Sequence, residues 1–401
     1  MRYSLSDVCF FVNEQIPTSE INLKNYISTE NMLPGKNGIQ KASSLPNTQN
    51  VRHYKKKDIL ISNIRPYFKK IWFAEFDGGC SADVLVFRSY SDKISSEFLF
   101  ELLSQDAFFN YVMHTSKGTK MPRGDKNAIM NFEFELLDRT SQNFIGTTGG
   151  NIYLKIKNNN QIIETLEEIA ASLFENWFVR FNFPDKDGNP YKSSGGKMVD
   201  SELGEIPDGW VVSSLPEIAN YQNGLAMQKF RPKGDALLPV IKIKELNQGF
   251  VDSNSERCDV DIKDSVTIYD GDVIFSWSAT LLVKIWTGGT GGLNQHLFKV
   301  TSDEYRKWFY YYWTKKHIDN FINIAKDKAT TMGHINKKHL EQACVLIPNA
   351  NQMDLFDEIM TPFVDQLLNI GLENETLKEL RDTLLPKLLS GEIELPTETE
   401  V

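Results

Sequence analysis

The chain has 401 residues, which is too long for one ordinary hydrophobic core and predicts two domains with connectors. Its formal net charge of −9 argues against a protein that binds nucleic acid alone, unless cations cluster locally or partner subunits supply them. No signal core or membrane-length apolar run is present, so we expect a cytoplasmic protein without membrane association. The 4 cysteines lie far apart, without a Cys-x-x-Cys pair, and we expect buried free thiols rather than disulfides or a zinc site.

The two halves of the chain repeat one another. The tripeptide Glu-Thr-Leu occurs at 164–166 and again 211 residues later, at 375–377. Further blocks recur in the same order at offsets of 210 to 214 residues: 4–8 with 214–218, 58–62 with 272–276, 70–72 with 284–286, 119–121 with 330–332, and 129–136 with 340–347. Such an order is hard to obtain by chance, so it predicts a duplicated unit, a globular domain followed by a long helix.

Each globular part carries mostly β-strand signals. Short buried strands are predicted at 58–62, 83–87, 271–275 and 295–300, and helices at 98–103 and 305–313. The expected class is α+β, with two similar domains of mixed, β-rich architecture and few helices. Trp72 and Trp286 hold equivalent places in the repeat, and we expect both in the core rather than at a stacking platform.

A long helix is predicted in the middle of the chain. Apolar or small residues recur there at steps of three, four or seven over 152–177, which predicts a coiled-coil seam about 40 Å long that only Asn159 interrupts. A second such helix is predicted at 374–385, with breaks near Pro362 and Pro386 because proline cannot continue the hydrogen-bond ladder. The seam positions expected to pair the helices are Ile163, Leu166, Ala170, Leu173, Trp177, Leu377, Leu380 and Leu384.

Composition changes suggest where the domains end. The stretch after the first long helix is rich in glycine, proline, serine and asparagine, which is typical of a linker. The expected division is a first globular domain at 1–145, a central helical region at 146–181, a linker at 182–200, a second globular domain at 201–350, a C-terminal helical region at 351–394 and a tail at 395–401.

Three motifs, together with the duplicated plan, carry a family resemblance. They are LEEIAASLFENWFV at 166–179, LGEIPDGW at 203–210 and LLPKLLSGEI at 384–393. They resemble the specificity (S, HsdS) subunit of type I restriction-modification enzymes. The resemblance implies two target recognition domains, each reading half of a bipartite double-stranded DNA target, joined by two antiparallel helices that set the gap between the halves.

The same resemblance implies the partners. Two methyltransferase (M) subunits would dock on the helices, and motor-nuclease (R) subunits would join through them. Adenine-N6 methylation with S-adenosylmethionine, and the use of ATP and magnesium, would belong to those partners. No cofactor is therefore expected in this chain, which would be non-catalytic by itself.

The best DNA-contact candidate in the first half is the stretch 116–127. It combines three lysines, one arginine, hydroxyl groups and loop-forming glycines, the types that hold phosphates and reach guanine edges. We expect Arg123 to read a base and the lysines to bind phosphates; the alternative is a solvated loop. The candidates are Lys117, Thr119, Lys120, Arg123 and Lys126. The basic run 52–57 is expected to be a solvated face, with phosphate contact as its alternative.

The second half offers two candidate stretches. The equivalent stretch, 326–338, lacks arginine, so its base contacts would come from His334, Asn336 or a lysine. In the loop 222–234, Gln228 could pair with adenine, and a Gly-flanked hairpin is the alternative. The candidates are Gln228, Lys229, Arg231, Lys328, Thr331, His334, Asn336 and Lys337.

Two other functions compete with DNA recognition. Residues 188–191, Gly-Asn-Pro-Tyr, partly match an amino-methyltransferase motif but lack its second proline, and we interpret them as a turn. An enzyme carrying its own methyltransferase is therefore disfavoured. The remaining alternative is a scaffold protein, two binding modules on a helical stalk with no role on DNA. A retention assay with double-stranded DNA separates the two hypotheses.

Overall fold

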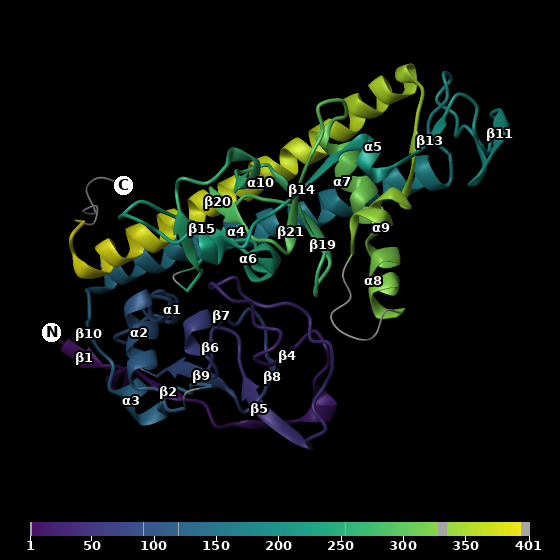
Figure 1. The fold of residues 1–401 in the computed structure, drawn as a ribbon. Helices are drawn as coiled ribbons and strands as arrows, with labels where there is room; N and C mark the ends of the chain where they lie inside the picture. Colours follow the sequence, from purple (N-terminus) through teal and green to yellow (C-terminus); the bar gives the residue numbers. More distant parts are fainter. Residues whose placement is uncertain (1, 91, 119, 253, 328–334, 394–401) are drawn as a thin grey trace. The chain divides into compact units, whose positions relative to one another are not determined.

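The computed structural model contains two compact units, which are described separately below (Figure 1). The first comprises Met1–Ile156 and Leu377–Val401, and the second comprises Lys157–Thr376. Both combine small sheets with a few helices, which confirms the expected α+β class. The residues that the structure describes are 2–90, 92–118, 120–252, 254–327 and 335–393.

The described residues of the first unit form three small sheets. Their strands are β1 (Arg2–Ser4), β2 (Cys9–Phe11), β3 (Gln15–Pro17), β4 (Tyr26–Ile27), β5 (Asn50–Tyr54), β6 (Ile59–Ser62), β7 (Ile71–Phe73), β8 (Gly78–Cys80), β9 (Val84–Ser89) and β10 (Glu133–Glu135). The helices are α1 (Ser96–Leu103), α2 (Asp106–His114) and α3 (Lys126–Met130). β1 pairs with β10, and the four-stranded sheets have the orders β2-β9-β6-β7 and β3-β5-β8-β4. The predicted strands at 58–62 and 83–87 and the helix at 98–103 are confirmed.

The second unit has the same kinds of sheet and one extra hairpin. Its strands are β11 (Met198–Ser201), β12 (Gly204–Pro207), β13 (Val211–Ser214), β14 (Asn220–Asn223), β15 (Leu237–Ile241), β16 (Arg257–Asp259), β17 (Thr267–Ile268), β18 (Val273–Ser276), β19 (Leu282–Ile285), β20 (Gly291–Leu293), β21 (Leu297–Thr301) and β22 (Cys344–Ile347). Its short helices are α5 (Leu215–Ile218), α6 (Ile243–Gln248), α7 (Lys307–Lys316), α8 (Ile318–Asp327) and α9 (Lys337–Glu341). The sheet orders are β11-β12, β13-β22, β14-β21-β18-β19 and β16-β15-β20-β17. β18, β21 and α7 confirm the predicted elements.

The topology repeats between the units. The sheet β2-β9-β6-β7 has its counterpart in β14-β21-β18-β19, and all neighbouring strands in both sheets are antiparallel. The registers agree as well, because Ile59 lies opposite Phe87 in the first sheet and Val273 lies opposite Val300 in the second. The pairs β1-β10 and β13-β22, and the helices α1–α3 and α7–α9, complete a correspondence that confirms the duplication.

Each of these sheets has two apolar faces, because its central strand is buried on both sides. On β6, Ile59 packs in one cluster with α1 and α2, whereas Leu60 packs in another with Trp72. On β18, Ile274 packs with Trp286 in the same way. Both tryptophans are 1% exposed, which confirms that they belong to the core.

Two long helices dominate the secondary structure. α4 (Arg139–Phe174) has 36 residues and continues into a five-residue π-helical turn (Glu175–Val179), and α10 (Ala350–Ser390) has 41 residues. α4 is thus longer than the seam predicted for it, because its first turns extend the helix before Ile152. Among the described residues, no helix is both long enough and apolar enough to span a membrane.

α10 is continuous, so the breaks expected near Pro362 and Pro386 are wrong. Both prolines are exposed, and buried residues of the same helix flank them. Met360 and Val364 are buried around the first proline, and Leu385 is buried beside the second. Each proline removes one backbone donor, but packing on both sides holds the helix across the gap in its hydrogen-bond ladder.

Within the second unit, α4 and α10 pair antiparallel. The side-chain amide of Asn159 donates to Asn374 Oδ1 (3.0 Å) and to Glu373 Oε2 (2.8 Å). Further along, the Trp177 ring stacks on Phe356 with 4.8 Å between centroids. Between the two contacts the numbering rises by 18 on α4 and falls by 18 on α10, so one register holds over about 27 Å. Asn159 is 1% exposed and continues the seam that it was expected to interrupt.

The seam of α10 does not follow the predicted leucines. Leu380 is 45% exposed and lies off the buried stripe, and Leu377 and Leu384 are half-buried. The stripe passes instead through the buried polar residues Asn374 and Arg381. The prediction from leucine spacing is off by one position because Asn374 and Arg381, two members of the buried stripe, are polar. Of the predicted seam residues of the first helix, Ala170 on α4 and Trp177 in the π-helical turn are buried, whereas Ile163, Leu166 and Leu173 are half-buried.

The four cysteines are free thiols. Cys9, Cys80 and Cys258 are buried, as predicted, and burial raises the pKa of Cys9 and of Cys80 to about 12. Cys344 is only half-buried, because it begins β22, which pairs with a single neighbouring strand in a two-stranded sheet.

Candidate nucleic-acid interface

The loop 116–124 of the first unit is closed by backbone hydrogen bonds. Lys117 N–H donates to Arg123 O (2.9 Å), and Arg123 N–H donates to Lys117 O (3.0 Å). The chain then enters α3, where the Asp125 carboxylate caps the helix by accepting from the N–H groups of Asn127 (3.0 Å) and Ala128 (3.2 Å). These contacts fix both ends of the loop. The exposed cations of the predicted site are Lys117, Lys120, Arg123 and Lys126.

Two of these cations already hold carboxylates. Lys117 Nζ lies 2.6 Å from Asp125 Oδ2, and Arg123 Nη2 lies 3.2 Å from Asp83 Oδ1. The hydrogen bond from Lys117 lowers the pKa of Asp125, and the same bond raises the pKa of Lys117, so both groups are charged at neutral pH. The cations are exposed, and ion pairs at an exposed surface contribute little stability. Either cation can therefore exchange its carboxylate for a phosphate or a base edge.

One basic residue beside this loop was not among the predicted site residues. Arg65 is exposed, and its backbone N–H donates to Pro122 O (2.8 Å) within the loop. Its φ of +50° is a left-handed conformation that few non-glycine residues adopt. The signal in the sequence was weak, a single arginine before Pro66, more than 50 residues from the loop.

The basic run 52–57 is engaged with the protein. Arg52 donates to Val84 O, and His53 and Lys55 lie 3.6 and 3.5 Å from the Glu14 carboxylate. Lys57 pairs with Glu97 at 2.9 Å. These contacts favour the interpretation as a solvated, internally paired face over phosphate contact.

In the second unit, the predicted residues divide between a loop and a helix start. The loop that follows β14 is anchored in the core by the buried Met227. Its predicted site residues, Gln228, Lys229 and Arg231, are exposed. Asn336 caps α9 by accepting from His339 N–H (3.2 Å), at the place equivalent to the Asp125 cap. The predicted site residues that lie outside the described residues are Thr119, Lys328, Thr331 and His334.

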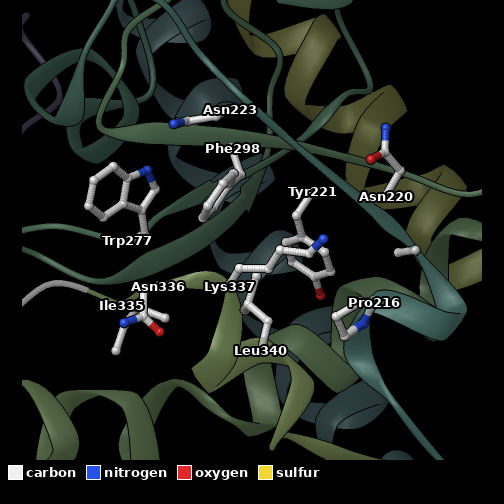
Figure 2. A pocket seen from close by; sticks show the side chains of 11 residues that line it. Pro216, Asn220, Tyr221, Asn223, Trp277, Phe298, Ile335, Asn336, Lys337 and Leu340 are labelled. Atoms are coloured by element: carbon white, nitrogen blue, oxygen red, sulfur yellow. The ribbon is translucent and has the colours of Figure 1, made fainter.

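Asn336 and Lys337 meet the beginning of the 222–234 loop at a pocket of about 630 Å³ (Figure 2). Asn223, the last residue of β14, lines the same pocket. The structure thus joins parts of the two predicted stretches, whereas Gln228, Lys229 and Arg231 do not line the pocket. The aromatic lining residues, Tyr221, Trp277 and Phe298, were not predicted. Trp277 directly follows the buried strand β18, which could have pointed to it, whereas Tyr221 and Phe298 lie within partly exposed strands that give no such signal.

The candidate interfaces present cations, amides, hydroxyl groups and aromatic rings, which bind phosphates and base edges. In the described part of the chain, no three His, Cys, Asp or Glu residues come together in a way that could hold a metal ion. The 188–191 stretch is confirmed as a turn, in which Asp185 Oδ1 accepts from Asn189 N–H (2.9 Å) and Gly188 N–H donates to Asp185 O (3.0 Å).

Two units of one topology, each with a polar loop leading into a capped helix and each packed on segments of two long helices, define a duplicated binding protein. Residues 207–382 match a family model described as the type I restriction modification DNA specificity domain. These residues thus match a domain of that family, and the chain is similar to type I restriction-modification specificity subunits, the family that its motifs predicted.

Named relatives extend the likeness over the whole chain. The HindI specificity subunit of Haemophilus influenzae is 23% identical, over 98% of this chain and 99% of that protein. The MjaIX specificity subunit of Methanocaldococcus jannaschii is 26% identical, over 75% of this chain and 70% of that protein. The crystal structure of a type I restriction-modification S subunit from M. genitalium shares the fold, with a TM-score of 0.54 and 13% identity over 97% of this chain and 95% of that chain.

Proposed function

We propose that each unit reads one half of a bipartite double-stranded DNA target. The observation that carries this proposal is the equivalence of the two polar loops, each of which leads into a helix capped by a side chain, Asp125 in one unit and Asn336 in the other. In the first unit Arg123 reads a base, and Lys117, Lys120 and Lys126 hold phosphates. In the second unit the residues around Asn336 and the 222–234 loop do the same.

The long helices act as the spacer between the two readers. A helix advances about 1.5 Å per residue and a DNA duplex about 3.4 Å per base pair, so helix length sets the number of unread base pairs in the gap. The buried contact between Asn159 and Asn374 supports this role, because a buried polar pair in an apolar seam disfavours slipped registers.

The helices also dock the partner subunits. Ile162 and Ile169 lie seven residues apart on α4, and each is more than two-fifths exposed. Their spacing places them on one face of the helix, which suits docking of a methyltransferase subunit. Two such subunits supply S-adenosylmethionine and adenine-N6 transfer, and motor-nuclease subunits join through them with ATP and magnesium. The chain itself is non-catalytic. Its net charge of −9 is compatible with DNA binding because the partner subunits also contact the DNA phosphates.

Genome-wide mapping of methylated adenines tests the proposal. The chain is co-expressed with its methyltransferase partner, and methylation is expected at one bipartite sequence. Replacing residues 1–140 with the corresponding unit of another specificity subunit should then change one half of that sequence and leave the other half intact. Methylation that ignores the replacement contradicts the proposal.

The scaffold alternative is tested by retention of duplex DNA. The chain is immobilised with and without its methyltransferase partner and incubated with genomic fragments. The proposal expects sequence-selective retention by the complex at moderate salt, with affinity that falls steeply as salt rises. A complex that retains no duplex at low salt would support a scaffold without a role on DNA.

A further inference from the structure

The pocket of the second unit lies on one face of the sheet β14-β21-β18, at the place where that face changes from buried to partly exposed. Asn223 lies opposite Phe298 in the strand register, and Phe298 lies opposite Phe275. Because side chains alternate along a strand, Tyr221 and Trp277, each two residues from a member of this row, lie on the same face. Phe275 is fully buried, whereas Phe298 and Trp277 are half-buried. The row therefore passes from the core at Phe275 to the partly exposed side chains of Phe298 and Trp277, which Figure 2 shows beside Asn223.

Three rings of this row form one aromatic wall. The Phe298 ring lies 5.9 Å from that of Trp277, with 37° between their planes, and 6.0 Å from that of Tyr221, with 89° between planes. The Tyr221 hydroxyl and Thr314 Oγ1 form a 2.6 Å hydrogen bond, which fixes that ring in place. Because the rings already touch one another, a ligand stacks on the wall rather than between its members.

The rest of the described lining combines the apolar residues Pro216, Ala219, Ile335 and Leu340 with three asparagines and a lysine, and it includes no carboxylate. Asn220 and Asn223 are exposed, and each has both a donor and an acceptor. The Asn336 oxygen caps α9, which leaves the amide NH₂ of that side chain as a donor. Lys337 adds a cation (Figure 2). In a chain with a net charge of −9, a pocket whose described lining has one cation and no Asp or Glu suits an anionic ligand.

We propose that this pocket binds a single unstacked nucleotide of the DNA target. Its base stacks on Trp277 and Phe298, the side chains of Asn223 and Asn336 pair with the base edge, and Lys337 binds the adjoining phosphate. The inference rests on the proposed function. A base inside a duplex is stacked on both faces and cannot reach such a wall, whereas a flipped base can. The volume of about 630 Å³ lies in the range of small-molecule sites and accommodates a whole nucleotide rather than only a base edge.

Among the residues that the structure describes, the first unit has no equivalent of this wall. The shared registers place Asn63 at the position of Trp277 and Leu85 at that of Phe298. The space there is also filled, because a Cβ on Gly124, the counterpart of Ile335, would lie 2.8 to 2.9 Å from Val112 and Asn63. The inference therefore applies to one half of the target and makes recognition of the two halves asymmetric.

The test uses the full chain assembled with its methyltransferase partner and duplexes of the mapped target. 2-Aminopurine, whose fluorescence rises when it leaves the base stack, replaces each base in turn, outside the methylated adenines. We expect a rise at one position in the half read by the second unit and at none in the other half. Trp277→Ala should abolish that rise and weaken binding about 10-fold, because one stacking platform is lost.

Milder substitutions separate the loss of a contact from misfolding of the protein. Trp277→Phe keeps a ring and should retain most of the fluorescence rise. Lys337→Gln should weaken binding, whereas Lys263→Gln, an exposed lysine outside the pocket, should leave binding unchanged. Flat fluorescence throughout the second half, with sequence-specific binding intact, overturns the nucleotide pocket and leaves the proposed function standing. If the assembled complex shows no sequence-specific DNA binding at all, both the proposed function and this inference are contradicted.

Discussion

The two units share one sheet but complete their second sheet at opposite edges. Three strands correspond, β4-β8-β5 in the first unit and β15-β20-β17 in the second, and the parallel pair β4/β8 matches β15/β20. The fourth strand is β3 against β5 in one unit and β16 against β15 in the other. The sheet that packs against helices is thus the common frame, whereas the outer sheet and its loops can change without disturbing that frame.

A second difference lies inside the common frame. Glu101 on α1 and Gly149 on α4 correspond, at the repeat offset of 211, to Tyr312 and Met360. Glu101 is 2% exposed, and burial raises its pKa to about 8. Tyr312 and Met360 are buried in one apolar cluster. The same place in the fold holds a titratable carboxyl against a glycine in one unit and aromatic packing in the other, so the two units should respond differently to substitution and to pH.

The largest expected effect comes from filling the space at Gly149. A Cβ built there would lie 2.2 Å from the Glu101 carboxyl carbon. Gly149→Ala should therefore destabilise the protein by about 2–3 kcal/mol through overpacking, despite the better helix propensity of alanine. Urea unfolding monitored by circular dichroism measures the change.

Gly150→Ala is the matched control. It lies on the same helix, and a Cβ at that position meets no atom within 4 Å. The control should be neutral or stabilise by up to about 1 kcal/mol. Equal effects of the two substitutions would show that the Glu101 side chain moves aside at little cost. The two units would then differ in sequence at this place but not in how tightly it is packed.

The next effect concerns the seam of the second unit. Asn159→Ala leaves the buried Asn374 amide with one hydrogen-bond partner fewer and should destabilise by about 2 kcal/mol. Replacing both asparagines by leucine should restore stability but weaken the preference for one helix register. Unfolding measurements check the first expectation. Methylation mapping checks the second, since a looser register should admit targets with more than one gap length.

Arg123→Ala should produce a smaller and strictly local effect. Loss of a bidentate base contact should reduce discrimination by about 10-fold at one base pair of the half read by the first unit. Lys117→Ala, which removes a phosphate contact, should weaken binding to all sequences alike and lower the salt dependence. Competition binding with single-base variants of the target measures both. An even loss across both halves with Arg123→Ala would contradict its assignment to base reading.

The smallest effect is a pH dependence confined to the first unit. Glu101 has a pKa of about 8 in the folded protein, against 4.5 for the free side chain. The folded state thus holds this proton more tightly, and the resulting stabilisation is complete below pH 4.5 and is lost as the pH rises through 8. Between pH 7 and 8 the wild-type protein should lose about 1 kcal/mol of stability relative to Glu101→Gln. Parallel pH profiles of the two proteins would refute the raised pKa.

The local elements and the duplication could be predicted from the sequence. The apolar runs at 58–62 and 271–275 appear as β6 and β18, and the equivalent residues Trp72 and Trp286 lie in the core. The seam of α4 was also predicted. These features depend on patterns within a few residues of one another, or on the likeness of two segments, and both can be measured along the chain without knowing what packs on what.

The features that the sequence did not predict depend on tertiary contacts. Packing on both sides carries α10 through Pro362, and the partner amide on Asn374 turns Asn159 from an interruption into a seam residue. The aromatic wall around Trp277 arises because strand register aligns residues from three separate strands, and the pairing of Arg123 with Asp83 joins groups 40 residues apart. Each outcome depends on contacts between distant segments, whose energies compete with local preferences and do not appear in the pattern of either segment alone.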